Sequence, residues 1–501
     1  MDQKITYIGK EPQLVVDDLL IQSMDGVKRR LHPGRKLPEP VLEADQPWEG
    51  VRAYVYGTII YDADANLFKM WYLARMGPGF EKRCPGLLRQ GDVILYATSS
   101  DGIQWDKPHL GLKEFDGSRD NNIVLLNFHS PTVFVDEDAS SEERYRLLAW
   151  DNRDDEHRGY LAAHSSDGLR WAEYPGNPVI PVKEVVETMT VTRHPETKEF
   201  FGYHRRWAKS EEDGKDFGDY RDMRRALAVT RSQDFVSWSE PTMILTPDKE
   251  DDSWAQNPEQ RGEFYNFSGF PYGSQFLGFL PVFQVMSVKP RADDSFGVPQ
   301  IRANLSPWDG PIEAQLAHSR DGLKWDRFED RSPIIPRGQP GSFDAGMILA
   351  VADRPVIVGD EVWTYYTGYN TTHGDTIPPK RSVIGRASWR LDGFVSLQGG
   401  AEGGVVETVP VHLEGNHLVV NVDASKGSLE VELLAEDGTP LSGYTRSDCR
   451  TISSDSVRHI VQWEQGEKIT TTKPLRIRFF ITDAHLYSFF SPRHASTYHE
   501  R

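Results

Sequence analysis

Five apolar, strand-like runs in the sequence each begin beside a side chain that can exchange a proton or bind a sugar hydroxyl. These side chains are Glu49, His129, Glu187, Glu263 and Asp344. A carboxylate beside an apolar strand is costly to bury unless something uses it. Glycoside hydrolysis needs two carboxyl groups flanking one bond, one protonated and one ionised. The set therefore predicts acid–base chemistry on a sugar if the fold brings the five runs together.

A recurring heptapeptide indicates how the runs are brought together. Copies of the form S-x-D-G-x-x-W end at Trp105, Trp171 and Trp325, and a variant with Phe in place of Gly ends at Trp238. A weaker copy, RLDGFVS, covers residues 390–396. Successive aspartates of the motif are 66, 67, 87 and 71 residues apart. A nearly constant period with a fixed signature marks a repeat architecture.

The repeating unit reads as four β-strands, and helical periodicity is nearly absent. Each unit ends in a hairpin at the DG pair, where Gly or Asp tolerates a positive φ. Five such units are typical of a five-bladed β-propeller. After the repeats, alternating runs with GN and DG turns indicate a β-sandwich. We expect an all-β chain with an N-terminal arm packing on the propeller (1–50), a five-bladed propeller (51–400), a C-terminal β-sandwich (401–492) and a tail (493–501).

The heptapeptide itself is expected to be structural. Its Asp and Gly make the hairpin, and its Trp covers the gap between neighbouring blades. The fifth copy has lost its Trp where the propeller meets the sandwich, so Trp389 or the second domain is expected to fill that place. The motif thus serves to locate the innermost strand of each blade by counting back from the turn.

In a propeller the axial funnel is the natural ligand site. The starts of the innermost strands and the ends of the second strands face this funnel. We expect Glu263 to be the general acid, Asp344 the base or nucleophile, and Glu187 a group that tunes the acid's pKa or holds a hydroxyl. On this hypothesis Glu263→Gln abolishes turnover and leaves folding nearly intact. Carboxyl groups about 5–5.5 Å apart would imply retention, and about 6.5–9.5 Å inversion.

A second group of residues is expected to bind the substrate. An alternative remains for each acidic residue, which could instead cap a strand or form a rim salt bridge, and His129 could be a structural, hydrogen-bonded histidine. The expected substrate contacts are Glu49, Asp151, Arg206, Tyr265 and His373.

Composition narrows the classes of partner. The formal net charge of −18 disfavours nucleic acid and anionic membrane surfaces. The two cysteines, Cys84 and Cys449, are expected to be free thiols. No cofactor motif is present, although a calcium ion on the axis is compatible with the fold. The N-terminus lacks an apolar leader, so a cytoplasmic location is expected; a secreted protein that had lost its leader would look the same.

The S-x-D-G-x-x-W hairpins, the five units and the appended sandwich resemble the β-fructosidase-like superfamily of five-bladed propellers, which contains glycoside hydrolase families 32, 43 and 68. The stretches VVDDLLI, PWEG, EFYNF, GSFDAGMI and LYSFF look like an uncharacterised branch of it. The resemblance implies an axial site with three acidic residues on successive blades and a carbohydrate ligand.

The sequence departs from family 32 in the motifs that carry catalysis there. It has no WMNDPNG-like or EC motif, and RHP at 193–195 stands nearest to RDP. The family's catalytic residues and fructoside specificity therefore do not transfer. We expect a glycosidase acting on an oligosaccharide or glycoside. The alternatives are a non-catalytic propeller that binds carbohydrate or protein, and a phosphorylase or lyase; basic or aromatic residues closing the funnel would favour a binder, and converging basic residues a phosphorylase.

Overall fold

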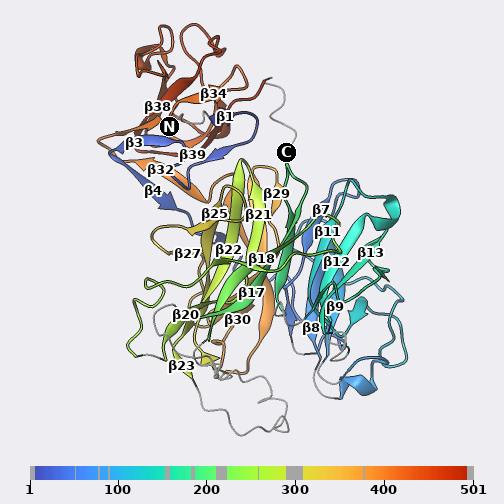
Figure 1. Ribbon diagram of the computed structural model, residues 1–501. Coiled ribbons are helices and arrows are strands. Elements are labelled where there is room, and N and C mark those ends of the chain that lie inside the picture. Colours follow the sequence, from blue (N-terminus) through green and yellow to red (C-terminus); the bar gives the residue numbers. More distant parts are fainter. Residues whose placement is uncertain are drawn as a thin grey trace.

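The computed structural model describes residues 6–50, 52–76, 79–88, 91–151, 153, 158–181, 187–209, 223–257, 259–288, 308–375 and 378–493. Within these ranges the chain forms a five-bladed β-propeller and a β-sandwich, which confirms the predicted fold class; the sandwich lies above the propeller in Figure 1. The helical elements of the described residues are short 3-10 turns: η1 (Phe80–Lys82), η2 (Ser141–Glu143) and η4 (Arg446–Asp448). No helix among them could cross a membrane.

The first three blades follow one another along the chain, and adjacent strands within each blade are antiparallel. Blade I contains β6 (Ala53–Tyr54), β7 (Ile59–Asp62), β8 (Leu67–Arg75), β9 (Asp92–Ser99) and β10 (Ile123–Leu126). Blade II contains β11 (Phe128–Val135), β12 (Tyr145–Asp151), β13 (Gly159–Ser165), β14 (Ala172–Glu173) and β15 (Ile180–Pro181). Blade III contains β16 (Met189–Arg193), β17 (Phe200–Lys209), β18 (Met223–Ser232) and β19 (Thr242–Leu245).

Blades IV and V share a single parallel bridge, Ile312 to Met347. Blade IV contains β20 (Arg261–Phe264), β21 (Ser268–Tyr272), β22 (Gln275–Val285), β25 (Ile312–Ser319), β26 (Trp325–Arg327) and β27 (Pro333–Ile335), with a separate ribbon of β23 (Ser287–Val288) and β24 (Trp308–Asp309). Blade V contains β28 (Met347–Val351), β29 (Val356–Val358), β30 (Glu361–Tyr369) and β31 (Ser382–Arg390).

The outermost strand of blade V comes from the N-terminal segment. β5 (Arg35–Lys36) pairs antiparallel with β31, placing Lys36 opposite Ala387. The ammonium group of Lys36 donates to Asp344 Oδ2 at 2.7 Å, and to the carbonyl oxygen of Pro336 at 2.8 Å. The two ends of the propeller sequence are thus joined by a strand pair and by a mostly buried ion pair.

The β-sandwich consists of two six-stranded sheets. One contains β1 (Thr6–Ile8), β3 (Ile21–Asp25), β33 (Gly404–Thr408), β34 (Val411–Leu413), β36 (Ser428–Ala435) and β38 (Leu475–Thr482). The other contains β2 (Gln13–Leu14), β4 (Val27–Leu31), β32 (Val395–Gly399), β35 (Val419–Asp423), β37 (Asp455–Ile460) and β39 (Ala484–Phe490).

The N-terminal segment differs from the arm that the sequence predicts. Its first four strands complete the sandwich sheets, whereas β5 and the residues after it join the propeller as predicted, with Leu42 bridged to Ile384 and Gly50 to Arg75. The sandwich also begins at β32 rather than at residue 401, because Val395 pairs with Leu31. These partners are far apart in the sequence, so no local pattern announces the pairing. Residues 1–5 and 494–501 of the predicted arm and tail lie outside the described residues.

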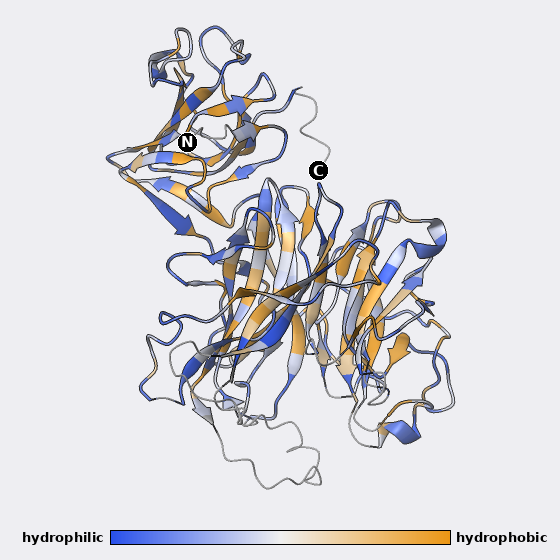
Figure 2. Ribbon diagram, in the orientation of Figure 1, coloured by the Kyte–Doolittle hydropathy of each residue, from blue (hydrophilic) through white to orange (hydrophobic). Residues whose placement is uncertain are grey.

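Burial patterns distinguish the two domains. In β38 buried and partly exposed residues alternate strictly, so that Leu475, Ile477, Phe479 and Ile481 face the opposite sheet. In β8 the central residues are buried on both faces because blades pack on each side. In Figure 2 apolar residues accordingly concentrate in the strands of both domains. Both cysteines are free thiols, as expected from the sequence, and the structure shows that both are buried.

The heptapeptide turns join neighbouring blades. In blade I the hydroxyl of Ser99 accepts from the amide of Gly102 at 2.8 Å, and Gly102 has a φ of 68°. The hydroxyl of Tyr365 in blade V donates to the carbonyl of Gly102 at 2.8 Å. Two equivalent hydrogen bonds of 2.8 Å join other neighbouring blades. The indole N–H of Trp71 in blade I donates to the carbonyl of Gly168 in blade II, and the hydroxyl of Tyr203 in blade III donates to the carbonyl of Gly322 in blade IV. The motif is therefore a clasp between blades.

The fifth turn joins the propeller to the sandwich. Asp392 accepts from the hydroxyl of Tyr272 in blade IV at 2.9 Å and from that of Ser488 in β39 at 2.7 Å. Trp389 stacks on Phe279 with ring centroids 5.7 Å apart and also packs against Phe394. Trp389 and the second domain together occupy the place of the missing motif Trp.

Ring closure gives the first prediction. Lys36→Met removes the cation that faces a carboxylate whose side chain is only 3% exposed. An unpaired buried charge is expensive, so we expect a loss of about 2–3 kcal/mol in the free energy of unfolding, measured by urea denaturation. Arg83→Met, which removes an exposed ion pair with Asp116, is the matched control and should change little. Equal small effects would contradict a closing role for Lys36.

Candidate functional site

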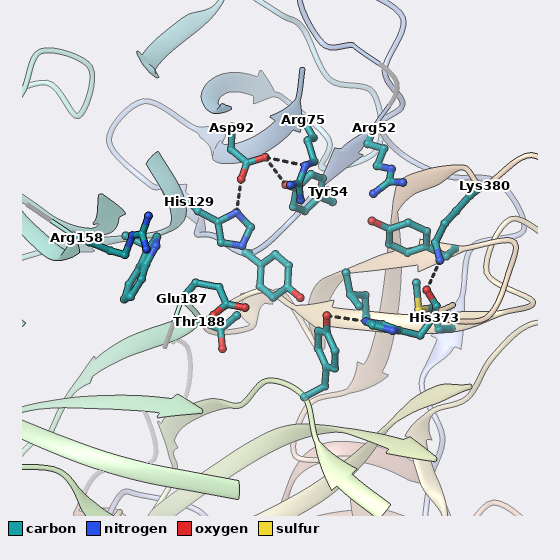
Figure 3. Close-up of a pocket in the computed structure, with 16 residues that line it drawn as sticks. Arg52, Tyr54, Arg75, Asp92, His129, Arg158, Glu187, Thr188, His373 and Lys380 are labelled. Atoms are coloured by element: carbon teal, nitrogen blue, oxygen red, sulfur yellow. Dashed lines mark hydrogen bonds and ion pairs between the residues drawn. The ribbon is translucent and has the colours of Figure 1, made fainter. Parts of the chain in front are cut away.

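An axial cavity of about 560 Å³ opens at the end of the propeller where the innermost strands begin. All five blades contribute to its lining, through residues that include Asp92, His129, Glu187, Tyr265 and Tyr369. This volume is suited to a small ligand. Figure 3 shows Asp92, His129 and Glu187 around one space, together with other lining side chains.

The position of each lining residue follows from antiparallel strand order. His129 and Glu187 lie at or just before the starts of innermost strands, and Tyr369 ends the second strand of blade V. The start of a third strand lies at the same edge as the end of the second, because the two are antiparallel. Asp92, directly opposite Arg75, begins the third strand of blade I. The starts of the innermost strands, the ends of the second strands and the starts of the third strands therefore all lie at the cavity.

Asp92 and His129 form a hydrogen-bonded dyad. Nδ1 of His129 lies 2.9 Å from Oδ2 of Asp92, and the hydroxyl of Tyr54 donates to Oδ1 at 3.0 Å. Burial alone would raise the pKa of Asp92, but His129 and Arg75 outweigh it and hold that pKa below its usual value. An ionised Asp92 then orients the imidazole through Nδ1 and leaves Nε2 for the cavity.

Glu187 is an ionised carboxylate in the same cavity. Its side chain is 47% exposed and accepts a hydrogen bond from the guanidinium of Arg205, which is 6% exposed. Burial would raise the pKa of Glu187, but Arg205 and, more weakly, His129 lower it to about 2. Figure 3 places His129 between Asp92 and Glu187. Arg205 is in turn held over the ring of Tyr265, 5.1 Å from its centroid.

Tyr265 and His373 form a second pair across the cavity. Nε2 of His373 lies 2.9 Å from the hydroxyl of Tyr265, and Nδ1 lies 3.1 Å from the carbonyl oxygen of Trp308. Burial, with the charge of Arg225, lowers the pKa of His373 to about 3. His373 is therefore neutral near pH 7 and acts as a fixed hydrogen-bonding group.

Glu263 lies outside this lining and is fully buried. Its Oε1 accepts from Nε of Arg261 at 2.8 Å, and its Oε2 accepts from Arg225. The guanidinium of Arg225 is packed between Trp207 and Trp308, 5.0 and 5.1 Å from their ring centroids. Both oxygens of Glu263 are thus used to neutralise two buried cations.

Asp344 is also separate from the cavity. Its Oδ2 accepts from Lys36 and from the hydroxyl of Tyr366, at 2.7 and 2.8 Å, and its Oδ1 accepts from Ser342 at 2.9 Å. The contact with Lys36 fastens β5 to blade V and so helps to close the propeller ring. The catalytic roles predicted for Glu263 and Asp344 stay predictions, and the geometry gives both residues a structural role.

The predicted substrate contacts divide in two. Tyr265 and His373 line the cavity, whereas Glu49, Asp151 and Arg206 are not among its lining residues. The buried carboxylate of Glu49 accepts from Tyr72 and Lys107 at 2.6 and 2.8 Å, and Asp151 is paired with Arg153 at 2.7 Å. Adjacent residues on a strand face opposite ways, so Arg205, and not Arg206, reaches Glu187 from behind the cavity lining.

The functional residues that the sequence reasoning missed begin the third strands. Asp92, Arg158 and Lys380 lie at or just before such starts in blades I, II and V. The DG turn follows the third strand of each blade. Counting back one strand from the turn, to the start of the third strand, would have found these residues; counting back three strands reaches only the innermost strand. Arg75, at a second-strand end, fits the expected pattern and lines the cavity.

A second cavity of about 870 Å³ lies between the propeller and the sandwich. Its acids are tied in ion pairs: Asp455 with Arg390 at 2.7 Å, and Glu361 with Arg35. Its histidine, His32, is bonded through Nε2 to Ser396 at 2.8 Å. The axial cavity, where an ionised carboxylate faces an imidazole, is therefore the better candidate for chemistry.

Metal-ligating side chains are not clustered in the described part of the chain. It contains no group of three or more His, Cys, Asp or Glu side chains that could hold a metal ion.

No protein-family model and no curated protein matches the sequence. Similar solved structures include a glycoside hydrolase (12% identity, 70% of this chain and 92% of that one, TM-score 0.43). Others are an N-acetylgalactosamine deacetylase from F. plautii (14%, 73% and 96%, 0.42) and a Schwanniomyces occidentalis fructofuranosidase (11%, 92% and 98%, 0.40). At this level of similarity none of their activities transfers to the present chain.

The placement of Glu263 predicts a stability defect. Glu263→Gln leaves two buried guanidinium groups without their anion, so we expect a loss of about 3–5 kcal/mol in the free energy of unfolding, measured by urea denaturation. Glu187→Gln, at a half-exposed carboxylate, should lose much less. A Glu263→Gln protein as stable as the wild type would restore Glu263 as a candidate catalytic residue.

A buried histidine predicts acid sensitivity. Burial lowers the pKa of His204 from 6.5 to about 4. Between these values the unfolded chain binds more protons, so stability falls as the pH decreases. At about 1.4 kcal/mol per pKa unit, the loss from pH 6.5 to 5 is about 2 kcal/mol. His204→Gln should remove that part of the loss in urea denaturation, whereas exposed His109→Gln should not; identical pH dependences would contradict this.

Proposed function

We propose that the protein is a glycoside hydrolase whose reaction takes place in the axial cavity, between Glu187 on blade III and His129 on blade II. The observation that carries this proposal is the presence in one cavity of an ionised carboxylate and an imidazole that a second carboxylate orients. We place the reaction on these residues, and not on Glu263 or Asp344, because the latter two do not line the cavity.

The roles follow from the contacts. A protonated His129 donates through Nε2 to the leaving glycosidic oxygen, while Asp92 holds the ring through Nδ1. Glu187 is ionised at working pH and stabilises the positive charge that develops on the sugar ring. It then either attacks the anomeric carbon or removes a proton from the water that does. The net reaction adds one water molecule across the glycosidic bond.

The cavity walls support a sugar as the ligand. Tyr54, Tyr56, Trp150, Tyr265 and Tyr369 present aromatic surface to the cavity. Aromatic side chains combine an apolar face with a polar handle, which suits the alternating C–H and hydroxyl surface of a sugar ring. Thr188 adds a buried hydroxyl without a partner among the described residues.

The same aromatic lining favours a second candidate function, a propeller that binds carbohydrate without cleaving it. Such a protein would bind an oligosaccharide through the same tyrosines, and substitution of Glu187 would alter affinity alone. Turnover distinguishes the two functions.

The test is a screen against aryl glycosides of both anomers and against oligosaccharides, with released product measured. For a substrate that is cleaved, Glu187→Gln and His129→Gln should each lower kcat at least about 100-fold. Asp92→Asn should shift the pH profile, because it changes how the imidazole is held. Glu196→Gln, an exposed residue of blade III outside the cavity, is the matched control.

Activity that survives both Glu187→Gln and His129→Gln would contradict the assignment. Binding of an oligosaccharide without turnover, lost on substitution of Tyr265, would favour the non-catalytic propeller. The configuration of the first product, followed by NMR, would separate a nucleophilic Glu187 from a basic one.

A further inference from the structure

The axial cavity is basic although the protein is acidic. Four of its described lining residues are Arg or Lys and two are carboxylates, whereas the whole chain has a formal net charge of −18. Arg205, which lies behind the lining, further neutralises Glu187. A local positive potential inside a negatively charged molecule favours an anionic ligand in that place.

The two carboxylates of the cavity are outnumbered by its cationic side chains, and each is already bound by other groups. Asp92 is hydrogen-bonded to His129 and to the hydroxyl of Tyr54. Its Oδ1 also forms a long ion pair with Nε of Arg75, at 4.0 Å, which is beyond hydrogen-bond distance. Glu187 is taken up by Arg205. Lys380 donates to the carbonyl oxygens of residues 372 and 373, at 2.8 and 2.6 Å.

Arg52 and Arg75 are the cations best placed to receive a ligand. The side chain of Arg75 is 39% exposed. Nε of Arg52 is buried and has no hydrogen-bond partner among the described residues, and its guanidinium lies 6.0 Å from the ring centroid of Tyr369. Figure 3 shows both side chains reaching the cavity from the same wall. Because both residues line the cavity and Arg75 is partly exposed, the oxygens of a ligand can approach these two guanidinium groups.

We propose that Arg52 and Arg75 form an oxyanion subsite. This inference rests on the proposed placement of a glycoside reaction in the axial cavity, and it names the ligand class there: a glycoside carrying an oxyanion, such as a uronic acid, or inorganic phosphate that attacks the bond of a neutral glycoside in place of water. Both sources present oxygens that an arginine fork can bind in pairs. A neutral sugar cleaved by water alone would leave Arg52 without an anionic partner among the described residues, and Arg75 with Asp92 alone at 4.0 Å.

Binding is the first test. Titration calorimetry of the full chain should give measurable affinity for glucuronate, galacturonate or inorganic phosphate, and at least 30-fold weaker binding of glucose and galactose. Arg52→Gln and Arg75→Gln should each weaken anion binding at least 10-fold. Arg83→Gln, on the surface and outside the cavity, should leave it unchanged. Absence of binding for all of these anions overturns the subsite.

Turnover then separates the sources of the oxyanion. Matched 4-nitrophenyl glucosides, glucuronides, galactosides and galacturonides are assayed with and without phosphate. Cleavage that prefers the uronides and ignores phosphate assigns the subsite to a sugar carboxylate. Cleavage of neutral glycosides only with phosphate, yielding a sugar 1-phosphate, assigns it to phosphate and replaces hydrolysis by phosphorolysis.

Two further outcomes keep the inferences distinguishable. Cleavage of neutral glycosides by water, with no anion binding and no effect of Arg52→Gln, overturns the oxyanion subsite and leaves the proposed hydrolase intact. Anion binding that depends on Arg52 and Arg75, without turnover of any glycoside, supports the subsite and contradicts the hydrolase.

Discussion

Closure of the propeller ring is the constraint on which the site depends. Blade V obtains its outer strand from Arg35–Lys36, and the Lys36–Asp344 ion pair fastens that strand to the blade. The cavity takes Asp92 from blade I and Tyr369 from blade V, the two blades that closure brings together. The clasps made by the heptapeptide turns join further pairs of neighbouring blades, and the bond from Tyr365 to Gly102 also joins blades V and I. Closure therefore determines the shape of the axial cavity as well as the stability of the domain.

Within the closed ring, pairing decides which charged groups remain available for chemistry. The carboxylate of Glu263 accepts hydrogen bonds from two buried arginines, and that of Asp344 accepts one from Lys36 on the closing strand. Glu187 makes one ion pair and keeps half of its side chain exposed, while His129 is held from one nitrogen. The outcome is a cavity with one accessible ionised carboxylate, one oriented imidazole and an excess of positive charge. Such a cavity favours an oxyanion near the reacting bond.

The sequence predicts the architecture well because the heptapeptide repeats with every blade, and its DG turns locate the strand ends. It also places Glu187, Tyr265 and His373 at the cavity. It does not reveal how carboxylates are used, since the partner of Asp344 is Lys36, 308 residues away. Nor does it reveal the strand exchange between the N-terminus and the sandwich, whose pairing depends on tertiary contacts rather than on local pattern.

The most direct measurement is a crystal structure of the Glu187→Gln variant bound to a glycoside that the wild type cleaves. We expect the sugar to lie in the axial cavity, with its glycosidic oxygen within hydrogen-bond distance of Nε2 of His129 and the side chain at position 187 facing the anomeric carbon. A sugar bound instead in the cavity between the two domains, or bound axially with its glycosidic bond remote from His129, would contradict it.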